Sequence, residues 1–218
     1  MKKKPVDTVQ FQHELPTLLV TSAKPARQAG WTAVKVFTQE ETRIGLLPIV
    51  RHRITACGVQ PIAPVGHRFD NFYLVGAVEP LTGESFFLEL PTLNTQTFQL
   101  WLEEFAHAFS DSLNILVLDN GAFHKAKALA WPANVVGCFL PPYTPELNPI
   151  ERLWRDLKDK LADLMAKSIE EFADTVCRLI TGYSKAALRS LTGYPYFIQA
   201  VRTAQQVITR LGRLAASH

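Results

Sequence analysis

Cysteine is scarce in this chain: Cys57, Cys138 and Cys177 are the three in 218 residues, and no two have metal-ligand spacing. An odd and scattered set indicates reduced thiols in a cytoplasmic compartment. No apolar run reaches the roughly 18 residues of a membrane span. The basic residues 2–4 are not followed by the apolar stretch of a secretory signal, and there is no internal repeat or low-complexity tract.

The residues that are present make up an ordinary globular composition, 47% hydrophobic and 20% charged. A length of 218 residues is enough for one full domain with a short extension. The net charge of +3 suits a nucleic-acid partner and a plain solvated surface equally well. Local basic clusters are more informative than the total, and they lie at residues 2–4, at residues 51–53 and at Arg202, Arg210 and Arg213.

Hydrophobic periodicity predicts alternating strands and helices through the middle of the chain. The clearest signal is a β-hairpin formed by residues 72–78 and 85–90, and Asn94 fits the N-cap of the amphipathic helix that follows. The other predicted elements are strands at 33–37, 115–118 and 135–139, a short helix from about 122, and a helix from the proline-rich segment to about 164. We therefore expect an α/β fold, an RNase H-like mixed five-stranded sheet flanked by helices.

Both ends of the chain are predicted to be helical. Residues 8–22 carry apolar side chains at helical spacing, but Pro16 predicts a broken or short helix. Ser168 fits the N-cap of a later helix, and a last helix covers about 197–211. The predicted division is a helix and linker at 1–30, an RNase H-like catalytic domain at 31–165 and a helical extension at 166–218.

Two acidic residues stand where a fold of this kind gathers its functional groups. The apolar strand 115–118 ends in Asp119, and open α/β sheets place their sites at the carboxyl edge of parallel strands. The proline-stiffened segment 141–149 leads directly into a helix that opens with Glu151. Paired carboxylates hold hard divalent cations, and a carboxylate-bound metal pair is suited to cutting phosphodiesters.

Each of these residues also has a structural interpretation. Asp119 can cap a following helix. Glu151 can close a capping box, because Asn148 fits the N-cap and Pro149 the first helical position. His124 lies about one turn beyond Asp119, where it would approach a metal site or a DNA phosphate, although a structural histidine is the commoner case.

A two-metal site needs a third carboxylate, and the first strand supplies the candidates. That strand is predicted to end at Glu40 and Glu41, and one of the two should face the site because neighbouring strand residues point to opposite faces. Asp70 ranks lower, since it precedes the second strand instead of ending the first.

Together these motifs resemble a known family. Asp119-Asn120 with His124, followed by Pro-Pro-Tyr-Thr-Pro-Glu-Leu-Asn-Pro-Ile-Glu-Arg-Leu-Trp at 141–154, is similar to the DDE transposases of the mariner superfamily, and more narrowly to their bacterial insertion-sequence branch. The stretch 41–46, the hairpin 76–83 and Leu-Thr-Gly-Tyr at 191–194 are also similar to that branch. The resemblance covers about residues 30–200.

The resemblance implies a catalytic core that uses two Mg²⁺ ions, or Mn²⁺ as a substitute. Such a core cleaves DNA at the ends of an insertion sequence and joins those ends to target DNA. Carried over to this chain, the catalytic and metal-binding residues are Glu40, Asp119 and Glu151. The family also implies a homodimer that acts on transposon ends and target DNA, without a membrane, in the bacterial cytoplasm at the nucleoid.

The chain departs from the family pattern in two places. The family has Asp followed by Glu before Arg-x-Gly, and here that Asp position is Glu40, whose extra methylene moves its oxygens by about 1.5 Å. Metal ions about 3.5–4 Å apart tolerate little misplacement. The family also carries a helix-turn-helix region before the core, for which this sequence has no room. A separate helix-turn-helix polypeptide is therefore expected to recognise the element ends.

These observations support a transposase catalytic domain as the leading function. The alternative is a catalytically impaired or domesticated transposase-derived DNA-binding protein, because of Glu40, and a third reading is a nuclease that acts on RNA–DNA hybrids. DNA contacts are expected mainly at phosphates. The candidate DNA-binding residues are Arg43, Arg51, Arg53, His124, Lys125, Lys127, Arg155 and Lys158.

Overall fold

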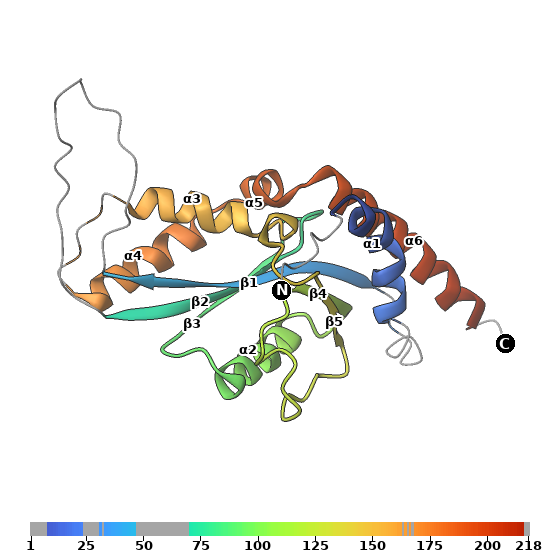
Figure 1. Ribbon diagram of the computed structural model, residues 1–218, viewed down its shortest axis with the longest axis horizontal. Coiled ribbons are helices and arrows are strands. Elements are labelled where there is room, and N and C mark those ends of the chain that lie inside the picture. Colours follow the sequence, from blue (N-terminus) through green and yellow to red (C-terminus); the bar gives the residue numbers. More distant parts are fainter. Residues whose placement is uncertain are drawn as a thin grey trace, which may run out of the picture.

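The computed structural model describes residues 8–23, 31, 33–46, 70–162, 164, 166 and 168–215. Within these ranges a five-stranded sheet lies between one helix on one side and five helices on the other (Figure 1). The predicted DNA contacts Arg51 and Arg53 lie outside the described residues, as do Cys57 and residues 2–4. No helix in the described ranges is long and apolar enough to cross a membrane.

The central strand of the sheet is β1 (Val34–Gly45), and the strand order is β3-β2-β1-β4-β5. On one side it pairs antiparallel with β2 (Asn71–Val78), which continues through a hairpin into β3 (Ser85–Leu90). On the other side it pairs parallel with β4 (Leu113–Leu118), which pairs parallel with β5 (Val135–Phe139). This arrangement confirms the predicted mixed five-stranded sheet.

The strand β1 is longer than the sequence indicates. Its apolar run predicts an end near Glu40, but the antiparallel ladder with β2 carries it on to Gly45. The strand continues because Thr42 and Ile44 are buried at alternate positions, a period-two pattern that pairing with β2 completes. Glu40 therefore lies inside a paired strand, opposite Gly76 of β2.

The turn of the β2–β3 hairpin is built around a buried glutamate. Glu79 accepts hydrogen bonds from the backbone N–H (2.6 Å) and the hydroxyl (2.8 Å) of Thr82, and burial raises the pKa of Glu79. Gly83 has a φ of 76°, and a Cβ there would lie 2.2 Å from the carbonyl oxygen of Lys185. The turn therefore packs directly against the start of α5 (Lys185–Thr192).

The helix α2 (Thr95–Ala108) covers one face of the sheet with aromatic side chains. Asn94 caps it as predicted, accepting hydrogen bonds from two N–H groups of its first turn. Phe98, Trp101 and Phe105 are fully buried, and the rings of Phe98 and Trp101 stack with their centroids 5.6 Å apart. This aromatic layer anchors the face that lies behind the candidate site.

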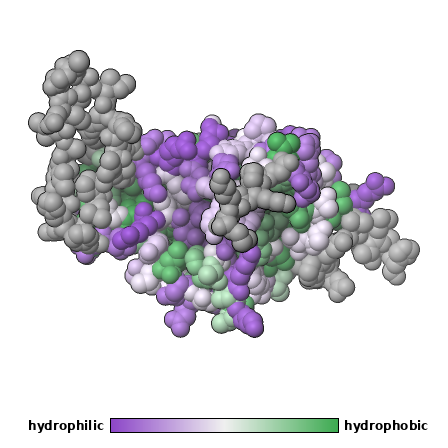
Figure 2. All heavy atoms as spheres, in the orientation of Figure 1, coloured by the Kyte–Doolittle hydropathy of each residue, from purple (hydrophilic) through white to green (hydrophobic). Residues whose placement is uncertain are grey.

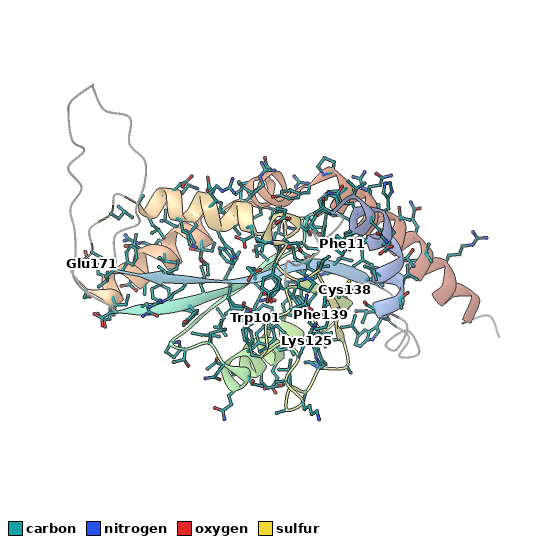
Figure 3. All side chains as sticks on the ribbon, in the orientation of Figure 1. Phe11, Trp101, Lys125, Cys138, Phe139 and Glu171 are labelled. Carbon is teal, nitrogen blue, oxygen red and sulfur yellow. The ribbon has the colours of Figure 1, made fainter. Side chains whose placement is uncertain are left out.

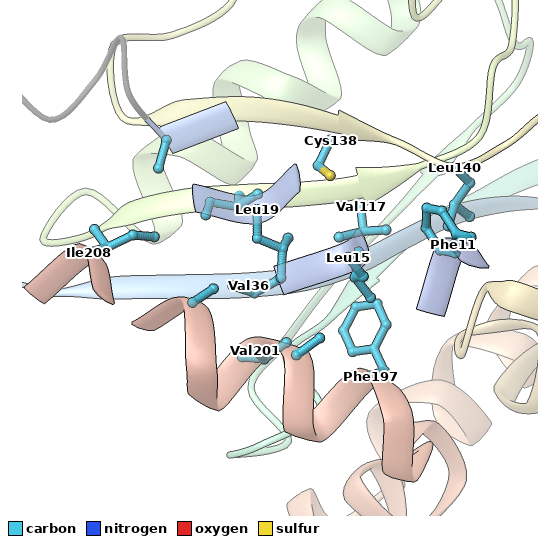
Figure 4. Close-up of a cluster of buried hydrophobic side chains, with 14 of the residues drawn as sticks. Phe11, Leu15, Leu19, Val36, Val117, Cys138, Leu140, Phe197, Val201 and Ile208 are labelled. Carbon is cyan, nitrogen blue, oxygen red and sulfur yellow. The ribbon is translucent and has the colours of Figure 1, made fainter. Parts of the chain in front are cut away.

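On the opposite face, α1 (Thr8–Ala23) and α6 (Pro195–Ala215) pack together over the sheet (Figure 4). The prediction that Pro16 breaks the first helix is wrong, because α1 runs through the proline without interruption. Its apolar stripe, which includes Phe11 and Leu15, is buried against strands and α6, and this burial holds the helix together.

The same face is completed by α3 (Glu151–Leu161), α4 (Ile169–Thr181) and α5, whose buried side chains pack around Ile44 and Phe72. The sequence did not indicate α5 as a separate helix. The predicted helix from 122 is also wrong: its backbone hydrogen bonds span three residues, as in consecutive turns. The division of the chain into three regions stays a prediction.

Candidate active site

Glu40 lies in β1, and Asp119 directly follows the last residue of the neighbouring parallel strand β4. The last paired residues of β1 and β4 are Thr38 and Val117, and each acidic residue follows two positions later. Because strand side chains alternate with period two, the Glu40 carboxylate faces the same side of the sheet as Thr38, while Asp119 lies at the end of β4 next to it. Neighbouring strands lie about 4.8 Å apart, so the sheet register brings these two predicted residues together.

The proline-rich segment joins this edge of the sheet to α3. At its start, the N–H of Leu140 donates a hydrogen bond (2.9 Å) to the carbonyl of Leu118, at the end of β4. Near its end the short 3-10 helix η2 (Pro145–Leu147) buries Leu147, whose carbonyl accepts a hydrogen bond from the hydroxyl of Tyr196. Both the sheet and α6 therefore fix the path that leads to Glu151.

Asn148 ties the end of that segment to β1. Its fully buried amide donates to the carbonyl of Gln39 (2.9 Å) and to Oε2 of Glu40 (3.0 Å), and its oxygen accepts a hydrogen bond from the hydroxyl of Thr38. The interpretation of Asn148 as a helix N-cap, with Glu151 closing a capping box, is wrong because α3 begins without a side-chain cap. Asn-Pro before a helix is an ordinary cap signal, and the true partner is 108 residues away in sequence.

Gly76 allows α3 to approach the sheet beside Glu40. A Cβ on Gly76 would lie 2.6 Å from the ring of Phe87 and 2.7 Å from the ring of Trp154. Trp154 follows Glu151 by three residues and so lies on the same side of α3. The close contact at Gly76 therefore draws the first turn of α3, with Glu151, toward β1.

His124 is a buried bridge between two carboxylates. Its side chain is 1% exposed, with Nε2 3.0 Å from Oε1 of Glu41 and Nδ1 2.9 Å from Oδ1 of Asp119. The ring packs against Phe98 and Phe123. Burial would lower the pKa of His124, but the contacts with Asp119 and Glu41 outweigh it and raise the pKa to about 9. A ring enclosed in this way lends no support to the predicted contact with a DNA phosphate.

The pKa values of the Asp119 and Glu40 carboxyl groups are shifted in opposite directions. The contact with His124 lowers the pKa of Asp119, although burial opposes it. Burial and, after it, the negative charges of neighbouring carboxylates together raise the pKa of Glu40 to about 8, although the hydrogen bond from Asn148 opposes this rise. Those neighbours are Glu41, Asp119 and Glu151. Glu40 therefore feels the charge of both other residues of the predicted triad.

Glu151 stands on the first turn of α3. Burial raises the pKa of Glu151, while the positive charges of Lys158 and Arg155 act in the opposite direction. Within the part of the chain that the structure describes, no three histidine, cysteine or acidic side chains are grouped closely enough to hold a metal ion as they stand. Glu40 therefore lies within the electrostatic influence of Asp119 and Glu151, although the three carboxylates are not gathered into a coordination shell.

The other acidic candidates lie elsewhere. Glu41 projects toward α2, where its Oε1 is contacted by His124 and by the amide of Gln39 (2.8 Å). Asp70 is exposed, just before β2 and beside the far end of β1. Of the three residues considered for the first strand, Glu40 is thus the one on the face of Asp119 and α3.

The described basic residues that were predicted to contact DNA lie mainly at the surface. Arg43, Lys125, Lys127 and Arg155 are exposed, and Lys158 is partly buried. Nζ of Lys125 contacts the side chain of Asn120 and lies 4.8 Å from the ring centroid of Phe139 (Figure 3). Figure 2 shows hydrophilic residues gathered over the region of α3. Contact of these residues with phosphates stays a prediction.

Comparison with known proteins identifies the family. A family model described as DDE superfamily endonuclease matches residues 36–173, more than half of the chain. This chain belongs to that family. A curated relative, the uncharacterized protein y4pE/y4sA of Sinorhizobium fredii (strain NBRC 101917 / NGR234), is 34% identical over 107 residues, which are 48% of this chain and 79% of the relative.

Solved structures of the Mos1 transposase share the fold. The paired-end complex with the left transposon end matches with a TM-score of 0.64 and 16% identity, covering 93% of this chain and 62% of that chain. The paired-end complex with Mn matches with a TM-score of 0.61 and 14% identity, covering 96% of this chain and 64% of that chain. The catalytic domain of Mos1 mariner transposase matches with a TM-score of 0.55 and 12% identity, covering 97% of this chain and 98% of that chain. This chain thus has the fold of that RNase H-like domain and spans less than two thirds of the paired-end chains.

Proposed function

We propose that this chain is a transposase catalytic domain that cleaves DNA at the ends of an insertion sequence and joins those ends to target DNA. The observation that carries the proposal is the strand register that sets Glu40 beside Asp119, with α3 bringing Glu151 toward them. Membership of the DDE endonuclease family supports the same chemistry. The shared fold extends this support, because Mos1 structures include paired-end and strand transfer complexes.

The donor chemistry of this site fits divalent cations. Glu40, Asp119 and Glu151 offer carboxylate oxygens, which Mg²⁺ and Mn²⁺ prefer as ligands. The raised pKa of Glu40 reflects burial first and then the negative charge of neighbouring carboxylates, which a cation would neutralise. When bound, a metal pair supplies activation of the attacking oxygen and stabilisation of the leaving oxygen. Mos1 has been solved with Mn and with Mg.

The chain itself orients the carboxylates for this role. The contact with His124 holds one oxygen of Asp119, and the amide of Asn148 holds one oxygen of Glu40. Glu40 is one methylene longer than the aspartate of the family pattern, and the Asn148 hydrogen bond restricts the extra freedom that this length brings. Buried, hydrogen-bonded supports of this kind are what hold ligands in a reproducible geometry.

DNA is the proposed partner, contacted mainly at its phosphates by exposed basic residues. The described candidates are Arg43, Lys125, Lys127, Arg155 and Lys158. By analogy with the family, we propose that two copies act together, that a helix-turn-helix region recognises the element ends, and that the protein works in the bacterial cytoplasm at the nucleoid.

A nicking and joining assay tests the proposal. The chain is incubated with supercoiled DNA carrying the element ends, with Mg²⁺, Mn²⁺ or chelator. Metal-dependent nicking is expected, and Asp119→Ala or Glu151→Ala should reduce it on the order of 10³-fold or more, since each removes a metal ligand. Glu79→Gln, which changes a buried glutamate outside the site, is the control and should retain activity. Nicking that survives both alanine substitutions would refute the assignment.

The alternative function, a DNA-binding protein with an impaired site, rests on Glu40. Under this alternative the natural chain binds DNA but does not nick it, and Glu40→Asp creates activity. Under the leading proposal the natural chain nicks DNA without this substitution. Glu40→Asp then only removes the hydrogen bond with Asn148. A parallel assay on RNA–DNA hybrids separates both from a hybrid-specific nuclease.

A further inference from the structure

We propose that Tyr143 is a stacking platform for an unpaired nucleobase beside the candidate active site, an inference that rests on the proposed function because it takes DNA as the partner. Two observations single out this residue. It is 81% exposed, and its φ of 62° is the one positive value at a non-glycine residue in the described ranges.

The backbone of Tyr143 is held in a conformation that its side chain disfavours. Left-handed φ values are uncommon for residues other than glycine, asparagine and aspartate, because Cβ crowds the neighbouring carbonyl. With four-fifths of the residue exposed, burial of the ring contributes little to folding. Residues in strained backbone conformations that are not part of the hydrophobic core are found mainly at ligand-binding sites. There the surrounding structure imposes the conformation.

The surrounding structure imposes it here through hydrogen bonds on both sides of the residue. The hydroxyl of Thr144 donates to the carbonyl of Pro141 (2.7 Å), which closes a tight turn around Tyr143. The side chain of Asn120 donates to the carbonyl of Leu140, which fastens the start of the segment beside Asp119. The ring is therefore presented on a fixed support.

The segment that carries Tyr143 connects the two halves of the candidate active site. Tyr143 follows Leu140 by three residues and precedes Asn148 by five, which are chain lengths of at most about 11 Å and 18 Å. Leu140 is paired with the strand that ends in Asp119, and Asn148 is bonded to Glu40. The exposed aromatic ring thus belongs to a short segment whose two ends are tied to the strands beside Asp119 and Glu40.

The chemistry of the ring points to a nucleobase as the ligand. Every base has a flat π-face, so stacking on an aromatic side chain is tolerant of sequence. In an intact duplex these faces are already stacked on one another. The ring is therefore expected to take a base that is unpaired, as at a cut end or an opened step next to the scissile phosphate. A polypeptide partner or a second copy of this chain is treated as an outcome of the test.

The test measures stacking directly with 2-aminopurine, whose fluorescence is quenched when it stacks. The full chain is titrated into a duplex with one unpaired 2-aminopurine at its end, and into the same duplex fully paired. Tyr143→Ala should remove the quenching and weaken binding of the unpaired end roughly 5- to 100-fold. Binding of the paired duplex should change less than about twofold. Tyr143→Phe and Tyr143→Trp should keep the quenching.

Tyr143→Gly separates stacking from folding. Glycine adopts positive φ readily, so the melting temperature should equal or exceed that of the natural chain while quenching is lost. The control is Leu100→Ala, at an exposed apolar residue of α2. It should change neither the melting temperature nor the quenching.

The outcomes distinguish this inference from the proposed function. If the natural chain binds neither DNA, the proposed function fails. If it binds DNA but Tyr143→Ala keeps the quenching, or weakens both duplexes equally, the stacking role fails alone. If Tyr143→Ala instead dissociates a dimer in sedimentation without affecting quenching, the ring belongs to an interface between copies and the inference is overturned.

Discussion

Glu40 and Asp119 occupy equivalent positions on neighbouring strands, yet the protein holds them by different means. The buried imidazole of His124 contacts Asp119 and lowers the pKa of its carboxyl group. The amide of Asn148, which carries no charge, holds Glu40, whose pKa is raised to about 8. Both contacts fix geometry, but only the imidazole also offsets charge. The Glu40 half of the site therefore gains most from an added cation.

The largest expected effect comes from removing the charged support. His124→Ala leaves Asp119 and the nearly buried Glu41 without their shared partner, because both contact the same ring. Loss of the buried contact with Glu41 costs about 3–5 kcal/mol, and the half-exposed Asp119 adds little because solvent screens its charge; urea unfolding of the metal-free protein would measure the loss. His107→Ala, at an exposed histidine of α2, is the control and should cost about 0.5 kcal/mol or less. A loss below about 1 kcal/mol for His124→Ala would remove the distinction drawn between the two supports.

A smaller loss of stability is expected from removing the uncharged support. Asn148→Ala leaves a buried carbonyl and hydroxyl of β1 without their partner, which costs about 1–3 kcal/mol. Metal-dependent nicking should fall about 10- to 100-fold, because Glu40 loses the bond that orients it. Asn94→Ala, which removes the N-cap of α2, should cost about 1 kcal/mol without changing activity. Equal activity in the two variants would show that Asn148 has no positioning role.

The pH dependence of stability offers a finer comparison. The unfolded chain loses the Glu40 proton near pH 4.5, whereas the folded chain keeps it until about pH 8, so the free energy of unfolding falls as pH rises through this interval. His124, with its folded pKa raised from 6.5 to about 9, stabilises fully below pH 6.5, and this contribution is lost as pH rises through 9. In metal-free protein, Glu40→Gln should reduce the decrease in the free energy of unfolding between about pH 4.5 and 8. His124→Gln should reduce the decrease between pH 6.5 and about 9. Urea unfolding at each pH measures this, and an unchanged slope in Glu40→Gln would contradict the raised pKa.

Local signals in the sequence were enough to predict the sheet and its main elements. The β2–β3 hairpin, the Asn94 cap and the strand ending in Asp119 depend on neighbours a few residues away, so their patterns are legible in one stretch of chain. Pro16 misled because tertiary burial of α1 outweighs the local preference of proline.

The supports of the site were not predictable in the same way. Asn148 bonds to a strand 108 residues earlier, and His124 contacts a glutamate 83 residues earlier, so no local pattern specifies either contact. The sequence alone identifies Asn148 as a cap and leaves His124 as a structural or surface residue or one near a metal site, until the fold supplies their partners. The motif was enough to identify Glu40 as a candidate. Its environment follows from the continuous strand β1 beneath α3, which only the sheet register shows.

The most direct test of the account is the effect of Mn²⁺ on thermal stability in single-carboxylate variants. A cation that binds the folded state raises the melting temperature by mass action. The natural chain should show this rise, and Glu40→Gln, Asp119→Asn and Glu151→Gln should each abolish it, while Glu79→Gln retains it. A full rise in any of the first three variants would contradict the claim that these carboxylates form one cation site.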